Sequence, residues 1–261
     1  AQLKSAVLLA GLYAEGETTV VEPVFTRNHT ELALRGFGAE VIIGQNTVSV
    51  RGGQRLCGID TTVPGDVSSA AFLIAAATLT PGSDVTLRNV GLNPGRRGIV
   101  DLLIAMGASI EILDNRLLGG EPVADLRVRP AALRGGPIGG AQIPQLIDEV
   151  PVLSVLATQS EEGMEIRDAG ELRVKESDRI RSIVENLRAM GAQVEEFEDG
   201  LAVPGRQPLH GAVINTYGDH RIAMAFAVAG LVAHGETVIE GAECAGVSFP
   251  GFFETLERMK G

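Results

Sequence analysis

The sequence contains no tryptophan, and aromatic residues make up only 4% of its 261 residues. Its two cysteines, Cys57 and Cys244, form no CxxC pair, and its four histidines form no HExxH motif, which argues against a zinc site. The longest apolar run, residues 222–233, is too short to span a bilayer. Two cysteines without a secretory segment fit a reducing compartment, so we predict a cytoplasmic protein.

Positive charge is also scarce, and most of it is arginine. The net charge of −11 argues against a general binder of nucleic acids or of anionic membranes. Only three of the 22 basic residues are lysines: Lys4, Lys175 and Lys260. The others are arginines, whose guanidinium groups bind carboxylates and phosphates through two parallel hydrogen bonds. Hydrophobic residues make up 45% of the chain, which excludes disorder and suits α/β layers built on Ala, Leu, Val and Ile.

One pattern recurs four times along the chain. An apolar helix is followed by a turn with glycine, a strand, and a second helix that ends at glycine before another strand. The turn glycines are Gly16, Gly82, Gly163 and Gly235, and the closing glycines are Gly38, Gly107, Gly191 and Gly261. Glycine after a helix supplies the left-handed conformation that ends it. We therefore expect a helix–strand–helix–strand unit used four times, the fourth cut short, with extra strands at 125–135 and 201–205.

The two helices of each repeat differ in character. The first is apolar nearly all round, which is typical of a buried helix, whereas the second is amphipathic, as in residues 179–190. The sequence thus predicts buried helices inside, with sheets and amphipathic helices outside. Chance similarity among amphipathic helices is the alternative, and four matched pairs at comparable spacing argue against it.

Charged residues gather where the predicted helices begin, and helix N-termini bind anions. In RVKESDR, residues 173–179, Lys175 and Arg179 lie four apart. On one helical face they repel each other unless an anion lies between them. Glu176 can pair with Arg179 three residues on. The alternative is a solvated first turn with ordinary ion pairs.

Two further segments carry the same signal. Asp219 is the predicted N-cap of an apolar helix, and Arg221 at its mouth requires either a bound anion or a structural carboxylate. Asp148 and Glu149 precede a proline and another apolar helix, either as an acidic first turn or with one of them as a general base. In PGDVSS, residues 64–69, we favour a structural N-cap. Together these residues indicate a substrate with at least two negative groups.

These segments resemble the 5-enolpyruvylshikimate-3-phosphate synthase family, the 3-phosphoshikimate 1-carboxyvinyltransferases. The resemblance covers residues 1–261 and is carried by RVKESDR, GDHRIAM, LIDEVP, PGDVSS, SFPGFF and AQLKSAVLLAGLYAEGETTV. It implies an inside-out α/β barrel, the enolpyruvyl transferase fold, in which βαβαββ units surround buried parallel helices in two domains that close on the substrate. Residues 1–63 would be the last part of one domain, and 64–261 three repeat units of the other, the last one truncated.

The resemblance also implies an activity. The family transfers the enolpyruvyl group of phosphoenolpyruvate to the 5-hydroxyl of shikimate 3-phosphate and releases phosphate, in the shikimate pathway of aromatic amino-acid biosynthesis. The reaction uses no metal and no organic cofactor, and the family is the target of glyphosate. The full-length protein would be a monomer. This chain's partners would be the two substrates and the missing N-terminal segment of its own protein, without which we expect it to be inactive.

Matching motifs imply roles for three catalytic residues, which would also contact substrate. Asp148 would lie on the shikimate hydroxyls, as the base. Glu176 would be the acid/base near the methylene group of phosphoenolpyruvate. Lys175 would contact the shikimate hydroxyl and the bridging oxygen. The resemblance leaves open which carboxylate makes which proton transfer.

Further residues would only bind substrate. Arg179 and Arg221 would hold phosphoenolpyruvate. Ala1 and Gln2 match the family's Ser-Ala-Gln segment, with Gln2 at the shikimate ring, and Arg27 matches a position that contacts shikimate 3-phosphate.

One departure and two alternatives remain. Val247 stands before Ser-Phe-Pro where many members have lysine, so either this subgroup lacks that phosphate contact or it binds phosphoenolpyruvate more weakly. The sister transferase acting on UDP-N-acetylglucosamine shares the fold, but RVKESDR and GDHR fit it less well. A non-catalytic anion-binding module made of these repeats is the other alternative.

Overall fold

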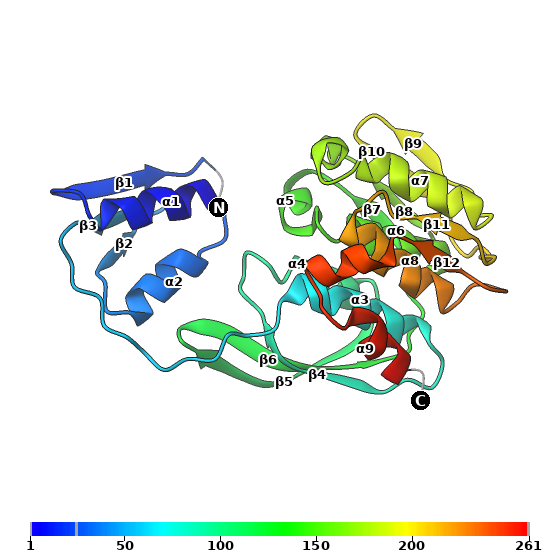
Figure 1. Cartoon of the computed structure of the whole chain (residues 1–261), viewed down its shortest axis with the longest axis horizontal. Helices are drawn as coiled ribbons and strands as arrows, with labels where there is room; N and C mark the ends of the chain where they lie inside the picture. The colour runs from blue at the N-terminus through cyan, green and yellow to red at the C-terminus, as the bar shows by residue number, and fades with distance from the viewer. Residues whose placement is uncertain (1, 24–25, 260–261) are drawn as a thin grey trace. The chain divides into compact units, whose positions relative to one another are not determined.

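The computed structural model describes residues 2–23 and 26–259 (Figure 1). Contacts between residues divide the chain into two units. The first unit comprises Ala1–Gly65, Arg88–Arg97 and Leu113–Asp125, and the second comprises Asp66–Leu87, Gly98–Ile112 and Leu126–Gly261. The domain boundary after residue 63 stays a prediction. The predicted substrate-binding residue Ala1 and the closing glycine Gly261 lie outside the described residues.

The first unit contains the first repeat. Helix α1 (Gln2–Gly11) and helix α2 (His29–Gly36) accompany a sheet of order β1-β3-β2, formed by β1 (Glu17–Val21), β2 (Val41–Ile43) and β3 (Thr47–Arg51). Strand β3 is antiparallel to both neighbours. The core includes Leu8, Leu34, Val41, Val48 and Val50. The predicted order of helices and strands is confirmed.

Helix α1 departs from the prediction that the first helix of each repeat is buried. Leu3 is 80% exposed, whereas Lys4 is only 5% exposed. The Lys4 ammonium lies 2.9 Å from Glu22 and 2.7 Å from Glu31, and these partners compensate for its burial. Burial alone would lower the pKa of Lys4, but the hydrogen bonds and charges of Glu31 and Glu22 outweigh it and raise that pKa. The prediction is therefore wrong for α1.

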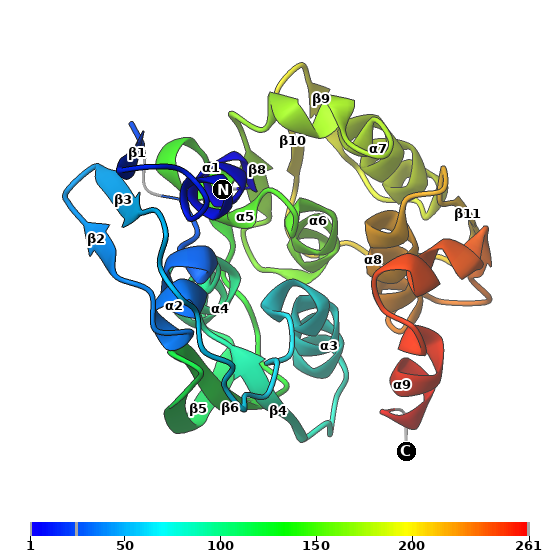
Figure 2. The ribbon, with the colours of Figure 1, turned by 60° about the vertical axis from the view of Figure 1, so that its left-hand side comes forward.

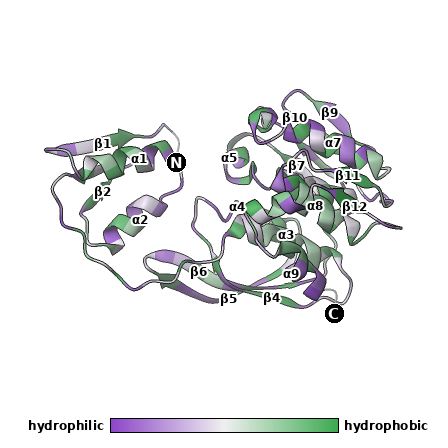
Figure 3. Ribbon diagram, in the orientation of Figure 1, coloured by the Kyte–Doolittle hydropathy of each residue, from purple (hydrophilic) through white to green (hydrophobic). Residues whose placement is uncertain are grey.

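The second unit is built on three buried helices, α3 (Val67–Leu79), α6 (Val150–Gln159) and α8 (His220–Gly230). They pack against one another and lie side by side in Figures 1 and 2. Helix α3 is hydrophobic along its length in Figure 3, and Phe72, Leu153 and Phe226 are at most 1% exposed. Burial of these helices confirms the prediction for the other three repeats.

Outer elements surround these helices. Four outer helices are present among the described residues: α4 (Gly98–Ala105), α5 (Ile143–Leu146), α7 (Arg179–Ala189) and α9 (Phe252–Arg258). Three 3₁₀ turns come before the last three of them: η1 (Gly140–Gln142), η2 (Gly170–Val174) and η3 (Ala242–Val247). One sheet has the order β7-β8-β10-β9, formed by β7 (Gly136–Ile138), β8 (Met164–Ile166), β9 (Glu195–Phe197) and β10 (Gly200–Val203). A parallel pair is formed by β11 (Val213–Asn215) and β12 (Val238–Glu240). Strand β10 and the end of β6 confirm the two predicted extra strands.

A further sheet has the order β4-β6-β5, formed by β4 (Val85–Gly91), β5 (Ser109–Leu118) and β6 (Glu121–Arg129), strands that contribute residues to both units.

The glycines that define the repeat share one backbone conformation. The four turn glycines and the three closing glycines within the described residues all have a positive φ. This is the left-handed region that favours glycine, so the turns predicted from the repeat are confirmed.

Candidate active site

The starts of three helices in the second unit are fixed by local interactions. The Asp219 carboxylate accepts a hydrogen bond from the backbone N–H of Arg221 at 2.9 Å and caps α8, as predicted. Asp178 caps α7 in the same way, accepting from Arg181 N–H at 3.1 Å. Pro151 lies in the first turn of α6, where its missing N–H costs nothing. These caps place the charged residues around each start.

Arg179 is the centre of the charged cluster. Its side chain is 1% exposed, and Nε donates to Asp219 Oδ2 at 2.7 Å. Nη2 donates to Glu176 Oε2 at 2.5 Å, and Nη1 lies 3.4 Å from Asp148 Oδ1. A buried guanidinium requires such partners, because an unpaired charge away from water is costly. One arginine thus gathers three carboxylates from three different segments.

Arg221 provides a second cation beside the same carboxylate. Its Nη1 donates to the backbone carbonyl of Asp148 at 2.8 Å, and Nη2 lies 3.5 Å from Asp148 Oδ2. Nη1 is also 3.8 Å from Glu149 Oε1. The side chain of Arg221 is 15% exposed and that of Asp148 is 22% exposed, so both reach solvent. Asp148 therefore lies between two guanidinium groups.

Lys175 corrects one expectation. Its backbone is extended (φ −78°, ψ −154°), and α7 begins only at Arg179, so the prediction that Lys175 and Arg179 share a helical face is wrong. The physical reason is that Asp178 caps the helix and ends the preceding segment there. Lys175 Nζ instead donates to Glu171 Oε1 at 2.5 Å. The predicted pair of Glu176 with Arg179 is confirmed, and the Glu176 side chain is 50% exposed.

Sequence reasoning missed how α3 joins this cluster. Asp66 caps α3 by accepting from Ser69 N–H at 2.9 Å, which confirms the structural interpretation of PGDVSS. However, the Ser68 hydroxyl also donates to the buried Glu149 carboxylate. The two residues are 81 positions apart, so no short sequence pattern predicts the contact. Glu149, at the start of α6, contacts both Ser68 of α3 and Arg221 of α8. The N-termini of these three helices therefore lie together.

Burial also affects a histidine at this point. His220 is the first residue of α8, next to Asp219 and Arg221. Burial, and then the positive charge of Arg221, lower the pKa of His220 below its ordinary value near 6.5. The neutral imidazole therefore predominates at neutral pH.

The remaining predicted residues belong to the first unit. Gln2 is exposed on α1, and Arg27 precedes α2. A Cβ added to Gly95 would lie 3.2 Å from the Cα of Arg27, so the two segments touch. Asn93 donates to Asn28 Oδ1 at 2.8 Å in the same place. Of the predicted site residues, the second unit thus gathers Asp148, Glu176, Arg179 and Arg221, with Lys175 close in sequence.

Among residues 2–23 and 26–259, no three His, Cys, Asp or Glu side chains are arranged to hold a metal ion. None of the helices in that part of the chain has both the length and the apolar character needed to cross a membrane.

Comparisons with known proteins agree with the fold. The structure matches an EPSP synthase from Acinetobacter baumannii with a TM-score of 0.94 and 43% identity, covering 99% of this chain and 60% of that one. The enolpyruvyl transferase NikO from Streptomyces tendae shares the fold at 21% identity and a TM-score of 0.78. The fold is therefore the inside-out α/β fold of the enolpyruvyl transferases, as predicted.

Sequence comparisons define the family more closely. The family described as EPSP synthase (3-phosphoshikimate 1-carboxyvinyltransferase) matches residues 1–256. The chain is 55% identical over 259 residues to the 3-phosphoshikimate 1-carboxyvinyltransferase of Desulforamulus reducens, and 54% identical to that of Solibacter usitatus. It covers 99% of its own length in both alignments but only 60% and 61% of these relatives. The chain belongs to the EPSP synthase family, and it spans about three fifths of the length of these relatives.

Proposed function

We propose that this chain is the larger part of an enzyme that transfers the enolpyruvyl group of phosphoenolpyruvate to the 5-hydroxyl of shikimate 3-phosphate. The observation that carries the proposal is the cluster of Arg179 and Arg221 around Asp148, with Glu176 alongside, where buried helices begin. Family membership and the names of the relatives support the same reaction rather than transfer to UDP-N-acetylglucosamine.

The two arginines suit phosphoenolpyruvate. This substrate carries a carboxylate and a phosphate, and guanidinium groups bind both through paired hydrogen bonds. The contacts of Arg221 with carboxylate oxygens are long, at 3.5 and 3.8 Å, so its Nη2 can turn toward a bound anion while Nη1 stays on the Asp148 carbonyl. The cluster lies where helices begin, and helix N-termini favour negative charge. In the proposal, Arg179 is the fixed cation and Arg221 the adjustable one.

The two partly exposed carboxylates suit the proton transfers. In the addition step, Asp148 takes the proton from the 5-hydroxyl, the oxygen bonds to C2 of phosphoenolpyruvate, and Glu176 gives a proton to C3. In the elimination step, the Glu176 carboxylate takes a proton back from C3, and the C3–H electron pair restores the vinyl group. Phosphate leaves with the electron pair of its C–O bond and takes the proton that Asp148 holds. Asp148 and Glu176 both contact the guanidinium of Arg179, at 3.4 and 2.5 Å, which holds the two carboxylates on one side of the site.

The other roles are assigned from the family resemblance alone. Lys175 would exchange its present partner Glu171 for the bridging oxygen of the adduct. Gln2 would lie at the shikimate ring, Arg27 would contact shikimate 3-phosphate, and Ala1 would complete the substrate-binding segment. The full protein would be a monomer that needs the part absent from this chain.

A cytoplasmic location completes the proposal. Cys57 and Cys244 form no disulfide, which fits a reducing compartment.

Phosphate release tests the proposed substrates. The chain is fused to, or co-expressed with, the part of the Desulforamulus reducens relative that it does not match. Phosphate release is then measured from phosphoenolpyruvate with shikimate 3-phosphate or with UDP-N-acetylglucosamine. We expect release only when phosphoenolpyruvate and shikimate 3-phosphate are both present. The proposal would be overturned if phosphoenolpyruvate released phosphate with UDP-N-acetylglucosamine but not with shikimate 3-phosphate. It would also be overturned if a folded assembly released no phosphate with either acceptor.

A further inference from the structure

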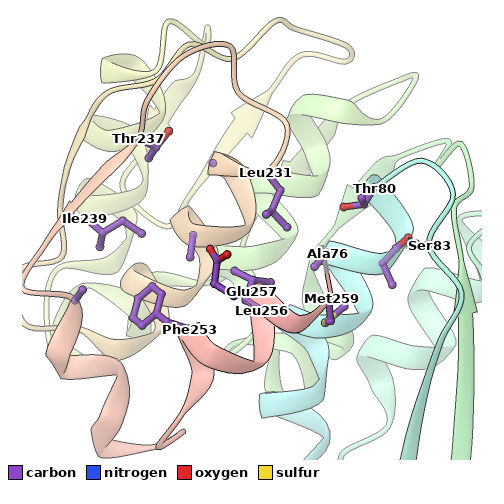
Figure 4. Close-up of a pocket in the computed structure, with 14 residues that line it drawn as sticks. Ala76, Thr80, Ser83, Leu231, Thr237, Ile239, Phe253, Leu256, Glu257 and Met259 are labelled. Carbon is purple, nitrogen blue, oxygen red and sulfur yellow. Dashed lines mark hydrogen bonds between the residues drawn. The ribbon is translucent and has the colours of Figure 1, made fainter. Parts of the chain in front are cut away.

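The pocket in Figure 4 is separate from the charged cluster of the candidate site. It has a volume of about 650 Å³, and α3, α8, β12 and α9 contribute its lining, which includes Ala76, Ile239 and Phe253. None of the described residues that line it is an arginine or a lysine, and none belongs to the cluster around Arg179. The lining therefore does not suit an anionic substrate, and other residues surround the charged cluster.

Arg173 is the first residue of RVKESDR, and it has no part in the proposed function. Its Nη2 donates to the backbone carbonyl of Phe197 at 2.6 Å and to Glu196 Oε1 at 3.0 Å. Its Nε donates to the backbone carbonyl of Glu198 at 2.6 Å. These acceptors lie at the end of β9, which pairs with β10 in an antiparallel hairpin. Arg173 is thereby fixed to the sheet of the third repeat.

The remaining nitrogen of Arg173 closes a loop. Nη1 donates to Asp178 Oδ2 at 2.9 Å and to Oδ1 at 3.2 Å. Asp178 is in turn the N-cap of α7. The ion pair therefore joins the two ends of the loop formed by residues 173–178, and this loop carries Lys175 and Glu176.

These contacts require an arginine. Arg173 makes five donor contacts, as many as a guanidinium has N–H groups. Its planar fork reaches β9 and Asp178 at the same time, whereas a lysine would present all its donors on one nitrogen. The side chain is only 26% exposed, so water screens these contacts in part. One residue thus ties the loop both to the start of α7 and to the β9–β10 hairpin.

The proposed anion-binding arginines are held by other partners. Arg179 donates to the buried Asp219 at 2.7 Å, and Arg221 donates to the Asp148 carbonyl at 2.8 Å. Glu176 differs, because its side chain is 50% exposed and its carboxylate reaches Arg179 from the loop. If the loop loosens, we expect Glu176 to move while Arg179 and Arg221 stay in place.

We propose that Arg173 is a positioning residue of the transferase. By closing the loop onto Asp178 and the hairpin, it holds Glu176 and Lys175 in the geometry that the transfer requires. The inference rests on the proposed function, because it concerns the roles given there to Glu176 and Lys175. A displacement of about 1 Å in a catalytic group can slow a reaction by about 100-fold. Loss of Arg173 should therefore lower kcat and leave the KM for phosphoenolpyruvate nearly unchanged.

Arg173→Ala and Arg167→Ala form a matched pair in the reassembled enzyme. Arg167 contacts the same hairpin through Asp199 and the ring of Phe197, but its ion pairs lie outside the loop. We expect Arg173→Ala to lower kcat by about 10–100-fold, with a KM within about threefold of the unsubstituted enzyme. Arg167→Ala should change neither by more than about twofold. Free guanidinium at millimolar concentration should restore part of the rate of Arg173→Ala, because it can occupy the vacated position, and should not change that of Arg167→Ala.

Hydrogen exchange follows the loop without any activity assay. In this chain, Arg173→Ala should raise exchange in peptides covering residues 174–182 by about fivefold or more, because the start of α7 loses its tie to the hairpin. Arg167→Ala should leave these peptides unchanged, and peptides of α6 and α8 serve as references. Asp178→Asn keeps a capping oxygen and removes the paired charge, so it should lower kcat in the same way and carries the test if Arg173→Ala does not fold.

Four outcomes would overturn the proposal. In the kinetic assay, these are an equal fall of kcat in the two variants, a rise in KM as large as the fall in kcat, or no restoration by guanidinium. In the exchange experiment, it is unchanged exchange in the loop. If the unsubstituted assembly releases no phosphate while Arg173→Ala still raises exchange, the proposed function fails and this inference falls with it, although the contact between Arg173 and the loop stands.

Discussion

Arg179 and Asp219 form a fully buried ion pair. Arg179 Nε donates to Asp219 Oδ2 at 2.7 Å, and the two side chains are 1% and 0% exposed. The same carboxylate caps α8 through the backbone N–H of Arg221. One aspartate thus holds the start of α8 and fixes the direction of the central arginine. The other two guanidinium nitrogens of Arg179 contact Asp148 and Glu176.

Loss of the negative charge at Asp219 should therefore be costly. Asp219→Asn keeps the shape and a capping oxygen, since Asn is also a good N-cap. It leaves the buried guanidinium without its fully buried carboxylate partner, so we expect the free energy of unfolding to fall by about 3 kcal/mol or more. Urea denaturation measures this change. Arg181→Gln, which removes an exposed pair with Glu185, is the control, and equal effects of the two variants would contradict the account.

His220 should make the stability of the chain depend on pH. Burial and Arg221 lower its folded-state pKa below the ordinary value near 6.5. Between these two values the unfolded state binds more protons, so stability is fully present above about pH 6.5 and falls as the pH drops. The contribution of His220 is at most about 1.4 kcal/mol per pH unit. We expect His220→Asn to flatten the fall in unfolding free energy between pH 7.5 and 5.5. An unchanged slope would refute this assignment.

Lys4 should hold the first unit together. Lys4→Met leaves the carboxylates of Glu22 and Glu31 without their shared cation, at a site where Glu31 is 1% exposed. We expect a loss of about 3 kcal/mol, and partial recovery when Glu31→Gln is added. Hydrogen exchange of peptides from α1 to β3 measures the effect, with peptides of α6 and α8 as references. If the double variant is less stable than Lys4→Met, the unpaired carboxylates do not explain the loss of stability in Lys4→Met.

Val247 offers a test of the family resemblance. It lies at the end of η3 and is 84% exposed, so replacing it costs no packing. In the reassembled enzyme, Val247→Lys should lower the KM for phosphoenolpyruvate by up to roughly fivefold, because an exposed charge contact contributes about 0–1 kcal/mol. Val213→Lys, at another exposed position, is the control. A KM that does not fall with Val247→Lys, or falls equally in both variants, would contradict the inference.

Much of the fold follows from local patterns. The apolar character of α3, α6 and α8 predicts burial, and the repeated glycines predict the turns, because both depend on the chain's own chemistry. The N-cap at Asp219 is equally local. Helix α1 is different: its apolar residues do not reveal whether a covering surface is present, and Leu3 remains exposed.

The site is less predictable than the fold. The pair of Glu176 with Arg179 follows from their spacing, but the start of α7 at Arg179 removes Lys175 from that helical face. The contact between Ser68 and Glu149 depends on how two buried helices pack, and no short window of sequence contains it. The same holds for Asp219 and Arg179, which are 40 positions apart. Tertiary packing, rather than any motif, gathers these groups.

The most direct test of the account is the rate of phosphate release by the reassembled enzyme when its proposed acid and base are removed one at a time. We expect Asp148→Asn and Glu176→Gln each to lower the rate by about 100-fold or more, because a positioned acid or base contributes about 10²–10⁴-fold. Glu165→Gln, on the exposed face of β8, should leave the rate unchanged. If Asp148→Asn and Glu176→Gln instead retain the rate of the control, these carboxylates do not catalyse the transfer and the account is wrong.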